Sequence, residues 1–334
     1  MKAMVLYKPM SVDENPLVYT DVDVPKPEGK EVLIKISKCG VCRTDLHIVE
    51  GELPPRKLPV IPGHQIIGYV VDVGENVEGV SKGDRVGLPW LYKSCGVCKY
   101  CRRGLENLCE NALFTGYSVD GGYAEYVVAS ADFVHKIPSG IADEFAAPLM
   151  CAGAIGYRSL KLTGLVERGE GVLGLFGYGA AAHLVLQIAK KLGLTVYVFT
   201  SSAWKIGKAL ENGADWAGKT DDSPPKPLDA AIVYAPVSSV FIEALKKVDR
   251  GGRVVLAEIY MSDVEKLPYS LLWHEREVKS VANVTRRDVA EVLQIASKHR
   301  IRPEVRLYPL KNANEALKEL KHRNPLGQIV LDVP

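Results

Sequence analysis

Val172-Leu-Gly-Leu-Phe176-Gly177-Tyr-Gly179-Ala-Ala-Ala182 decides the fold of the second half of the chain. Five almost wholly apolar residues indicate a buried parallel strand, and a helix is predicted from Ala180 to Leu192. The G-x-G-x-x-A between them is the permitted variant of the Rossmann fingerprint. The first glycine makes the tight turn, the second lets backbone approach a pyrophosphate at the helix N-terminus, and Ala182 takes the close-packing position. The alternative is an ordinary strand-to-helix turn, but the strand that follows the helix favours a dinucleotide site.

Apolar strands and helices alternate beyond residue 152, which predicts a doubly wound parallel sheet. The expected strands are Val172–Phe176, Thr195–Phe199, Ala230–Tyr234 and Arg253–Ala257. The expected helices are Ala180–Leu192, Lys205–Asn212 and Val240–Val248, with two more near 287–299 and 312–322 and a terminal strand at Gln328–Val333.

No acid follows the second expected strand, where an NAD site usually has Asp or Glu to bind the ribose hydroxyls. The chain instead has Thr200, Ser201, Ser202 and Lys205. Hydroxyls and a lysine can receive a 2′-phosphate, which a carboxylate would repel. The alternative is a helix start capped by Ser202 with an exposed lysine. The pattern favours NADP over NAD.

The first 150 residues are predicted to be mostly β, with runs such as 31–36 and 68–73 between Gly and Pro punctuation. The stretch 92–111 has little apolar periodicity and is expected to be a lobe held by a metal.

Six of the seven cysteines fall into two metal-ligand patterns. Four are clustered, which suits a closed, structural tetrahedral zinc site. They are Cys95, Cys98, Cys101 and Cys109. Cys42 and Cys151 lie far apart with His64 between them, and two thiolates with one imidazole suit a catalytic zinc that keeps an open position.

Composition limits the remaining possibilities. The chain has 334 residues, 47% of them hydrophobic and 25% charged, with a net charge of +2. Interspersed charges argue against nucleic acid or an anionic membrane as the main partner. The start shows no signal peptide, and the most apolar region, 172–192, contains glycine, histidine and lysine, unlike a membrane span. We expect a cytoplasmic protein with reduced thiols.

Several ordered motifs resemble the zinc-dependent medium-chain alcohol dehydrogenases. The resemblance runs essentially end to end. Its motifs are Gly40-Val-Cys42-Arg-Thr44-Asp-Leu-His47, Pro62-Gly-His64, Lys82-Gly-Asp-Arg-Val86, the four-cysteine lobe, Pro148-Leu-Met-Cys151-Ala-Gly153, the Rossmann turn and Thr285-Arg286-Arg-Asp288. The resemblance implies that Cys42, His64 and Cys151 bind the catalytic zinc and that the four clustered cysteines bind a structural one.

The resemblance also implies roles for the residues near Cys42. Zinc acts as a Lewis acid on the alcohol oxygen, Thr44 takes the alcohol proton, and His47 passes it to solvent. Asp45 orients the ligand imidazole. Thr44 could instead be strand filler and His47 a surface residue.

Arg43 and Arg286 match positions that contact the cofactor phosphates, and solvated surface arginines are the alternative. Trp90 matches a substrate-pocket aromatic, which would favour small or flat substrates, although core packing is an equal alternative.

Two residues depart from the family pattern. Gln65 replaces the usual Glu after the ligand histidine, so ligand exchange by that carboxylate is not expected. Cys39 is an extra thiol, which we interpret as a small buried side chain, with an alternative ligand role left open.

The expected fold is α/β, with a GroES-like β domain and a Rossmann doubly wound parallel-sheet domain. The β domain takes 1–152 and 285–334 with both zinc sites, the Rossmann domain takes 153–284, and the active site lies in the cleft between them. The expected function is reversible NAD(P)-dependent oxidation of primary or secondary alcohols to aldehydes or ketones. An aldehyde reductase and a non-catalytic zinc- and nucleotide-binding redox sensor are the alternatives. The expected partners are a small-molecule substrate and further copies of the chain, as a homodimer or homotetramer.

Overall fold

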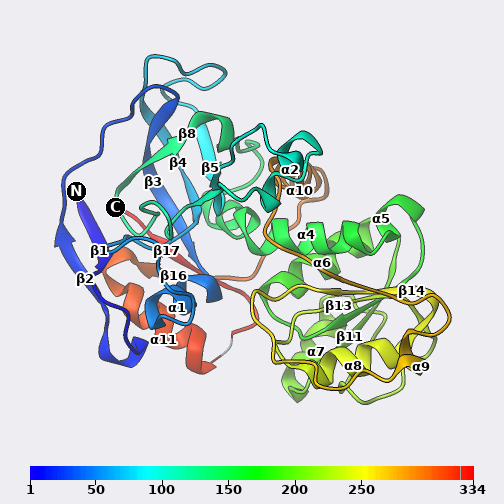
Figure 1. The fold of residues 1–334 in the computed structure, drawn as a ribbon. Coiled ribbons are helices and arrows are strands. Elements are labelled where there is room, and N and C mark those ends of the chain that lie inside the picture. Colours follow the sequence, from blue (N-terminus) through cyan, green and yellow to red (C-terminus); the bar gives the residue numbers. More distant parts are fainter. Residues whose placement is uncertain (324) are drawn as a thin grey trace. The chain divides into compact units, whose positions relative to one another are not determined.

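The chain forms two compact units. The computed structural model describes residues 1–323 and 325–334. The first unit contains Met1–Cys151 and Asn283–Pro334, and the second contains Ala152–Ala282 (Figure 1). The boundaries expected from the sequence, after residues 152 and 284, lie close to these.

The second unit is built on a six-stranded parallel sheet. The strand order is β12-β11-β10-β13-β14-β15, and every neighbouring pair is parallel. In sequence numbering within the unit this is 3-2-1-4-5-6, the doubly wound Rossmann order. The strands are β10 (Val172–Phe176), β11 (Thr195–Phe199), β12 (Trp216–Gly218), β13 (Leu228–Val233), β14 (Val248–Leu256) and β15 (Glu277–Ser280).

Helix α6 packs against β11 and α4, and α8 packs against β13 and β14 (Figure 1). The helices are α4 (Ala152–Leu162), α5 (Leu165–Arg168), α6 (Ala180–Lys191), α7 (Ala203–Glu211), α8 (Ser238–Lys247) and α9 (Tyr269–Leu272). Phe176 and Phe199 end adjacent strands and stack in the core with ring centroids 4.1 Å apart. Both aromatic rings are fully buried. Their packing holds together the ends of the two strands beside the glycine-rich turn.

The first unit is mainly antiparallel β, as expected. Its largest sheet has the order β16-β17-β3-β4-β5-β9, with β8 also paired to β3, and only β16 and β17 are parallel. These strands are β3 (Glu31–Val41), β4 (Gln65–Val73), β5 (Arg85–Leu88), β8 (Tyr126–Ser130), β9 (His135–Lys136), β16 (Val305–Pro309) and β17 (Gln328–Asp332). Two small sheets pair β1 (Lys2–Leu6) with β2 (Leu17–Asp21), and β6 (Leu91–Lys93) with β7 (Leu113–Phe114). The GroES-like and Rossmann fold class expected from the sequence is confirmed.

Short helices connect these strands and carry most of the polar residues of interest. The α-helices are α1 (Arg43–Glu50), α2 (Lys99–Arg102), α3 (Asp143–Ala146), α10 (Arg286–His299) and α11 (Ala313–Arg323). The 3₁₀ helices are η1 (Val12–Glu14), η2 (Glu106–Leu108), η3 (Ala131–Phe133), η4 (Ala147–Met150) and η5 (Leu310–Asn312). Across residues 1–323 and 325–334, no helix has the length and apolar character that crossing a membrane requires.

Candidate active site and metal centres

Cys42, His64 and Cys151 converge although they are far apart in the sequence. Strand β3 runs antiparallel to β4 with Gly40 opposite Gln65, so the residues that follow β3 and precede β4 meet at one end of the pair. Cys151 arrives from the end of η4. The three ligand atoms lie within 4.8 Å of one another, and the two sulfur atoms are 3.9 Å apart. Sulfur atoms bound at about 2.3 Å to one tetrahedral zinc lie roughly 3.8 Å apart, so the spacing fits a shared metal ion.

The His64 ring is oriented for metal binding. Its Nδ1 lies 2.9 Å from Oδ1 of Asp45, and its Nε2 is buried without a hydrogen-bond partner. Asp45 is itself held, because its Oδ2 accepts hydrogen bonds from the Cys42 backbone N–H (2.8 Å) and from the Tyr123 hydroxyl (3.2 Å). A carboxylate that holds Nδ1–H leaves the Nε2 lone pair for a metal. This buried nitrogen has no hydrogen-bond partner and lies beside two sulfur atoms. A zinc ion bound by all three atoms would give the nitrogen the partner that it lacks.

The short distances among Cys42, His64 and Cys151 shift the pKa values of all three side chains. The hydrogen bond with Cys151 lowers the pKa of the Cys42 thiol well below its usual value, and His64 lowers it further. The same contact raises the pKa of Cys151. Burial opposes charge on His64, but the Asp45 carboxylate and Cys42 together outweigh burial and raise the His64 pKa to about 10. A metal ion must therefore displace protons from Cys151 and His64 when it binds.

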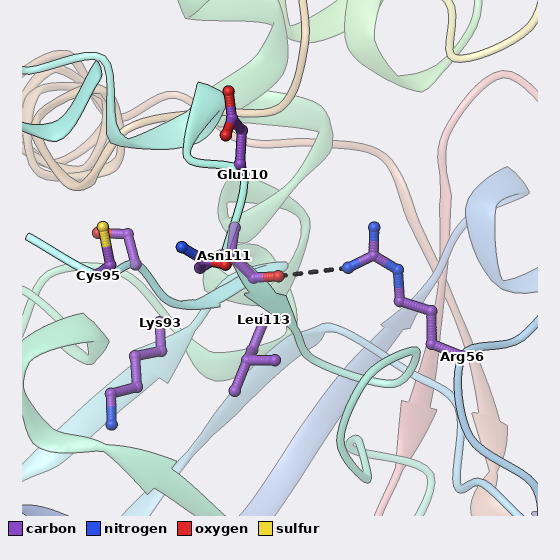
Figure 2. A pocket seen from close by; sticks show the side chains of 8 residues that line it. Arg56, Lys93, Cys95, Glu110, Asn111 and Leu113 are labelled. Carbon is purple, nitrogen blue, oxygen red and sulfur yellow. Dashed lines mark hydrogen bonds between the residues drawn. The ribbon is translucent and has the colours of Figure 1, made fainter. Parts of the chain in front are cut away.

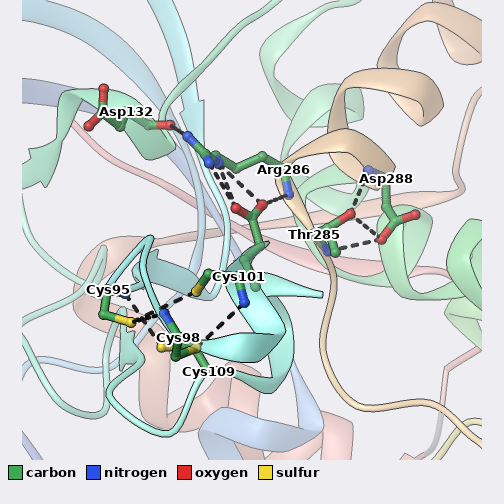
Figure 3. Close-up of polar contacts among 9 residues, drawn as sticks. Cys95, Cys98, Cys101, Cys109, Asp132, Thr285, Arg286 and Asp288 are labelled. Atoms are coloured by element: carbon green, nitrogen blue, oxygen red, sulfur yellow. Dashed lines mark hydrogen bonds and ion pairs between the residues drawn. The ribbon is translucent and has the colours of Figure 1, made fainter. Parts of the chain in front are cut away.

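The four clustered cysteines also meet, around the short helices α2 and η2 (Figure 3). Cys95 Sγ lies 4.0 Å from Cys101 Sγ, and the Cys95 backbone N–H donates to Cys109 Sγ over 3.4 Å. Backbone N–H groups of Cys98 and Cys101 donate to the preceding cysteine sulfur of the set. No disulfide joins cysteines within the described chain. Backbone N–H groups of Val97 and Cys98 lower the pKa of Cys95 to about 6, whereas burial raises the pKa of Cys109 to about 11. Four converging cysteine sulfur atoms suit a closed zinc site.

Thr44 and His47 lie on α1, three residues apart and therefore on one face of the helix. The Thr44 side chain is buried, and its Oγ1 lies 3.8 Å from Cys42 Sγ. The alternative that Thr44 fills a strand is wrong, because helix α1 begins at Arg43. His47 is half-buried, and its Nδ1 contacts Oε2 of Glu52. Sequence reasoning did not identify Glu52.

Trp90 lies beside the candidate catalytic site. Its ring centroid is 6.0 Å from that of His64 and 4.7 Å from that of Phe114, and Tyr117 packs next to both aromatics. Trp90 also packs against the hydrophobic core. The two interpretations made from the sequence are therefore compatible, because one ring can contribute to both the core and a wall next to the ligand histidine.

The two departures from the family pattern are both buried. Gln65 is fully buried, and neither atom of its amide has a hydrogen-bond partner. A Cβ at Gly40 would lie 2.9 Å from the Gln65 side chain, so the glycine makes room for the glutamine. Cys39 is fully buried, outside the group that includes Cys42, and burial raises the pKa of its thiol. It has the environment of an inert, small apolar side chain.

The glycine-rich turn of the second unit has the geometry that a pyrophosphate requires. Gly177 has φ 92°, a conformation that favours glycine. Gly179 begins α6, and a Cβ there would meet no atom of the chain within 4 Å. A larger side chain at this position would therefore not clash with the rest of the chain. The open space beside the helix N-terminus is suited to an approaching phosphate. Ala182 is fully buried, as its close-packing position predicts.

The residues after β11 surround the start of α7. Thr200 is buried, and its Oγ1 accepts a hydrogen bond from the Ser202 N–H over 3.4 Å. Ser201 is exposed. Ser202 is the N-cap residue, but its side chain makes no capping hydrogen bond. Lys205 is buried with its Nζ 5.5 Å from the Trp204 ring centroid. The alternative interpretation of this segment is a helix start capped by Ser202 with an exposed Lys205. That alternative is wrong about Lys205, because the lysine is buried.

The two candidate phosphate-binding arginines differ in their surroundings. Arg43 is exposed at the first position of α1. Arg286 begins α10 (Figure 3). Its guanidinium binds the Glu106 carboxylate and lies 4.5 Å from the centroid of the Phe133 ring. Arg286 thus has a structural contact that sequence reasoning missed, since nothing in the sequence marked Glu106 as its partner.

A shallow hollow of about 440 Å³ lies beside the four-cysteine lobe (Figure 2). Its wall includes Arg56, whose Nη1 donates to the Ala112 carbonyl oxygen over 3.4 Å. The other lining residues are Lys93, Ser94, Cys95, Glu110, Asn111 and Leu113. None of them belongs to the Cys42, His64 and Cys151 cluster, so this hollow is separate from the candidate chemistry.

Known proteins are similar to the whole chain. The alcohol dehydrogenase GroES-like domain matches residues 28–139, and the zinc-binding dehydrogenase family matches residues 181–298. A probable alcohol dehydrogenase, AdhA of Mycobacterium tuberculosis, is 44% identical over 337 residues, covering 99% of this chain and 97% of the relative. A cobalt- and zinc-bound thermostable alcohol dehydrogenase from Pyrobaculum aerophilum is similar in structure, with TM-score 0.89, 26% identity and 99% of both chains covered. An enzyme termed CAD from Helicobacter pylori, complexed with NADP(H), has TM-score 0.87 and 26% identity, covering 99% of this chain and 97% of that one.

Proposed function

Because the chain belongs to the medium-chain alcohol dehydrogenases, oxidoreductases that act on CH–OH groups, we propose that Cys42, His64 and Cys151 hold its catalytic zinc. The observation that carries this assignment is the orphaned Nε2 of His64, buried beside two sulfur atoms while Asp45 holds the other ring nitrogen. The reaction is the reversible oxidation of alcohols to aldehydes or ketones.

The residues around the zinc ligands divide the remaining work. When bound, zinc supplies Lewis acidity at the alcohol oxygen, and the nicotinamide supplies the two-electron acceptor. Thr44, buried beside Cys42, takes the alcohol proton, and His47, nearer to solvent on the same helix face, releases it. Asp45 fixes the His64 tautomer, and the Tyr123 hydroxyl fixes Asp45.

We propose a second zinc in the four-cysteine lobe, giving two per chain. Its support is the complete thiolate set and the backbone N–H groups directed at its sulfur atoms. Four thiolates leave no open coordination position, so this zinc would hold structure and take no part in turnover.

The cofactor is proposed to be NADP, with NAD as the second possibility. The pyrophosphate would contact the turn at Gly177 and Gly179. A 2′-phosphate would find Thr200, the two serines that follow it and Lys205, and the segment 200–205 contains no carboxylate to repel it. Arg43 and Arg286 are proposed to contact the cofactor phosphates.

Trp90, with Phe114 and Tyr117 beside it, is proposed to limit the substrate pocket. An aromatic wall next to the ligand histidine favours small or flat primary and secondary alcohols over bulky branched ones. Aldehyde reduction remains the alternative physiological direction.

A homodimer or homotetramer is proposed from the edge of the second unit. Strand β15 ends the parallel sheet and is exposed along its whole length. Tyr269 and Trp273 are exposed nearby, at 69% and 56%. An unpaired edge with apolar neighbours is suited to pair with a second copy of itself across a two-fold axis. A cytoplasmic location is proposed because both zinc sites need reduced thiols.

Initial-rate kinetics with NAD and NADP across primary, secondary and aromatic alcohols tests the proposal, together with zinc analysis. We expect turnover that a chelator abolishes, with higher catalytic efficiency for NADP. A metal-free protein with full turnover would contradict the catalytic zinc, and higher efficiency with NAD would contradict the ribose-pocket argument alone.

A further inference from the structure

We propose that Glu52 is a positioning residue of the proton relay, holding His47 in the tautomer that accepts a proton at Nε2. The inference rests on the relay role of His47 proposed above. It goes further, because it assigns the relay a carboxylate that faces solvent. The arrangement resembles the acid that orients a catalytic histidine in hydrolytic triads.

The side-chain contact carries the inference. His47 Nδ1 lies against Oε2 of Glu52, with the imidazole 20% exposed and the carboxylate 61% exposed. An ionised carboxylate only accepts hydrogen bonds, so Nδ1 must carry a proton in this contact. In the neutral ring, Nε2 then holds the lone pair.

The backbone builds this contact. Helix α1 ends at Gly51, whose φ of 82° is left-handed, and a Cβ there would lie 3.1 Å from Cβ of Pro9. The chain then turns back, and the Leu53 N–H donates to the His47 carbonyl oxygen over 3.0 Å. The hydrogen bond fixes the residues on either side of Glu52 relative to His47, so the pairing does not depend on two long side chains meeting by chance.

Other charged groups near α1 have different partners. Glu50 accepts hydrogen bonds from Lys321 Nζ (2.7 Å) and from the Val12 N–H (2.9 Å). Asp13 of η1 pairs with His322 of α11 over 2.8 Å and lies 3.9 Å from Lys321. Arg43 lies one turn before His47 on the same helix. The Glu52 carboxylate is therefore the acid committed to His47, and its charge also acts on Lys321.

The proton balance is simple. A proton that arrives at Nε2 makes the ring an imidazolium, and the Glu52 carboxylate stabilises that charge through Nδ1–H. Water then removes the Nε2 proton, and the neutral Nδ1–H tautomer is restored for the next turnover. No electron is transferred in this step.

The test is the pH dependence of kcat/KM for alcohol oxidation, which reports groups of the free enzyme. Glu52→Gln should move the acid-side midpoint to lower pH, since the imidazolium loses its anionic partner. Glu52→Lys should move it further in the same direction. Salt should shrink both shifts, because the pair is exposed. If Glu52 had only a structural role, the midpoints of the pH profiles would not follow the charge of the side chain at position 52.

Two further variants separate the possible failures. His322→Gln, which removes the other imidazole paired with a carboxylate beside α1, should leave the wild-type profile unchanged. His47→Gln should remove the acid-side transition. If His47→Gln keeps the wild-type profile, the relay itself is wrong. If His47→Gln changes the profile while both Glu52 variants retain the wild-type midpoint, only the role of Glu52 is overturned.

Discussion

Glu106, between the third and fourth cysteines of the metal lobe, binds Arg286 at the start of α10. Its carboxylate accepts hydrogen bonds from the Arg286 backbone N–H (2.7 Å) and from Nε and Nη2 of the guanidinium (3.0 and 2.8 Å). Arg286 Nη1 also donates to the Asp132 carbonyl oxygen (Figure 3). The segment proposed to bind the structural zinc is thus joined to a helix 180 residues away in sequence.

Glu106→Gln should therefore lower the stability of the first unit while zinc remains bound. The amide keeps the shape but loses the charge, and the cost should be about 1–3 kcal/mol for a charged hydrogen bond. Thermal unfolding of the zinc-replete protein measures it. Glu291→Gln is the matched control, because Glu291 pairs with Arg287 of the same helix, whose side chain is 82% exposed, and exposed pairs contribute little. Equal midpoints for the two variants would refute the role of Glu106.

His135 should make stability depend on pH. Burial and, second to it, the charge of Arg286 together lower the pKa of its imidazole from the ordinary 6.5 to about 4. Between these values the unfolded chain binds the proton and the folded chain does not, so stability is complete above about pH 6.5 and is lost as pH falls toward 4. The loss can reach about 3 kcal/mol. Denaturant unfolding of wild type and His135→Gln from pH 7 to pH 4 should show a smaller loss in the variant, and parallel curves would contradict this account.

Thr44→Val tests the inner end of the proton relay. The substitution keeps the shape of a side chain that is 9% exposed and removes the hydroxyl. The rate of alcohol oxidation should fall by roughly two or more decades, the scale of lost acid–base help. His47→Gln should cost less, because water can substitute at the solvent end. A Thr44→Val enzyme with wild-type kcat would exclude Thr44 from proton transfer.

Cofactor choice is tested by two substitutions after β11. Thr200→Asp should move preference toward NAD, because it adds a ribose acceptor and repels a 2′-phosphate. Lys205→Met retains the apolar stem of the buried lysine and should weaken NADP binding by about 1–3 kcal/mol with little effect on NAD. Binding of the reduced cofactors, followed by fluorescence, measures both. An equal loss for NAD and NADP would mean that Lys205 acts only in packing.

Local patterns in the sequence were sufficient where one short segment determines one element. The expected strands Val172–Phe176 and Thr195–Phe199 match β10 and β11, because continuous apolar runs between turns define buried parallel strands. The pattern of four clustered cysteines also carried its own information, since its spacing is a property of one segment. The predicted helix Lys205–Asn212 began too late, because α7 starts at Ala203 and helix ends are set by backbone geometry that composition marks weakly.

Contacts between distant segments could not be predicted in this way. Glu106 and Arg286 pair only because the lobe and α10 meet in the folded unit, and neither residue has a pattern that identifies the other. The burial of Lys205 depends on packing around α7, which sequence cannot supply. Glu52 was detectable in principle, since a glycine after α1 indicates a helix end that turns the chain back, but its contact with His47 required coordinates.

Zinc content measured together with turnover for Cys42→Ala tests the central claim most directly. The wild-type chain should contain about two zinc ions, and Cys42→Ala should retain the structural one, fold, and lose alcohol oxidation. Cys98→Ala is the matched control, which should mainly lower stability. A folded Cys42→Ala protein that still oxidises alcohols at the wild-type rate would contradict the assignment of Cys42, His64 and Cys151 as the catalytic zinc site.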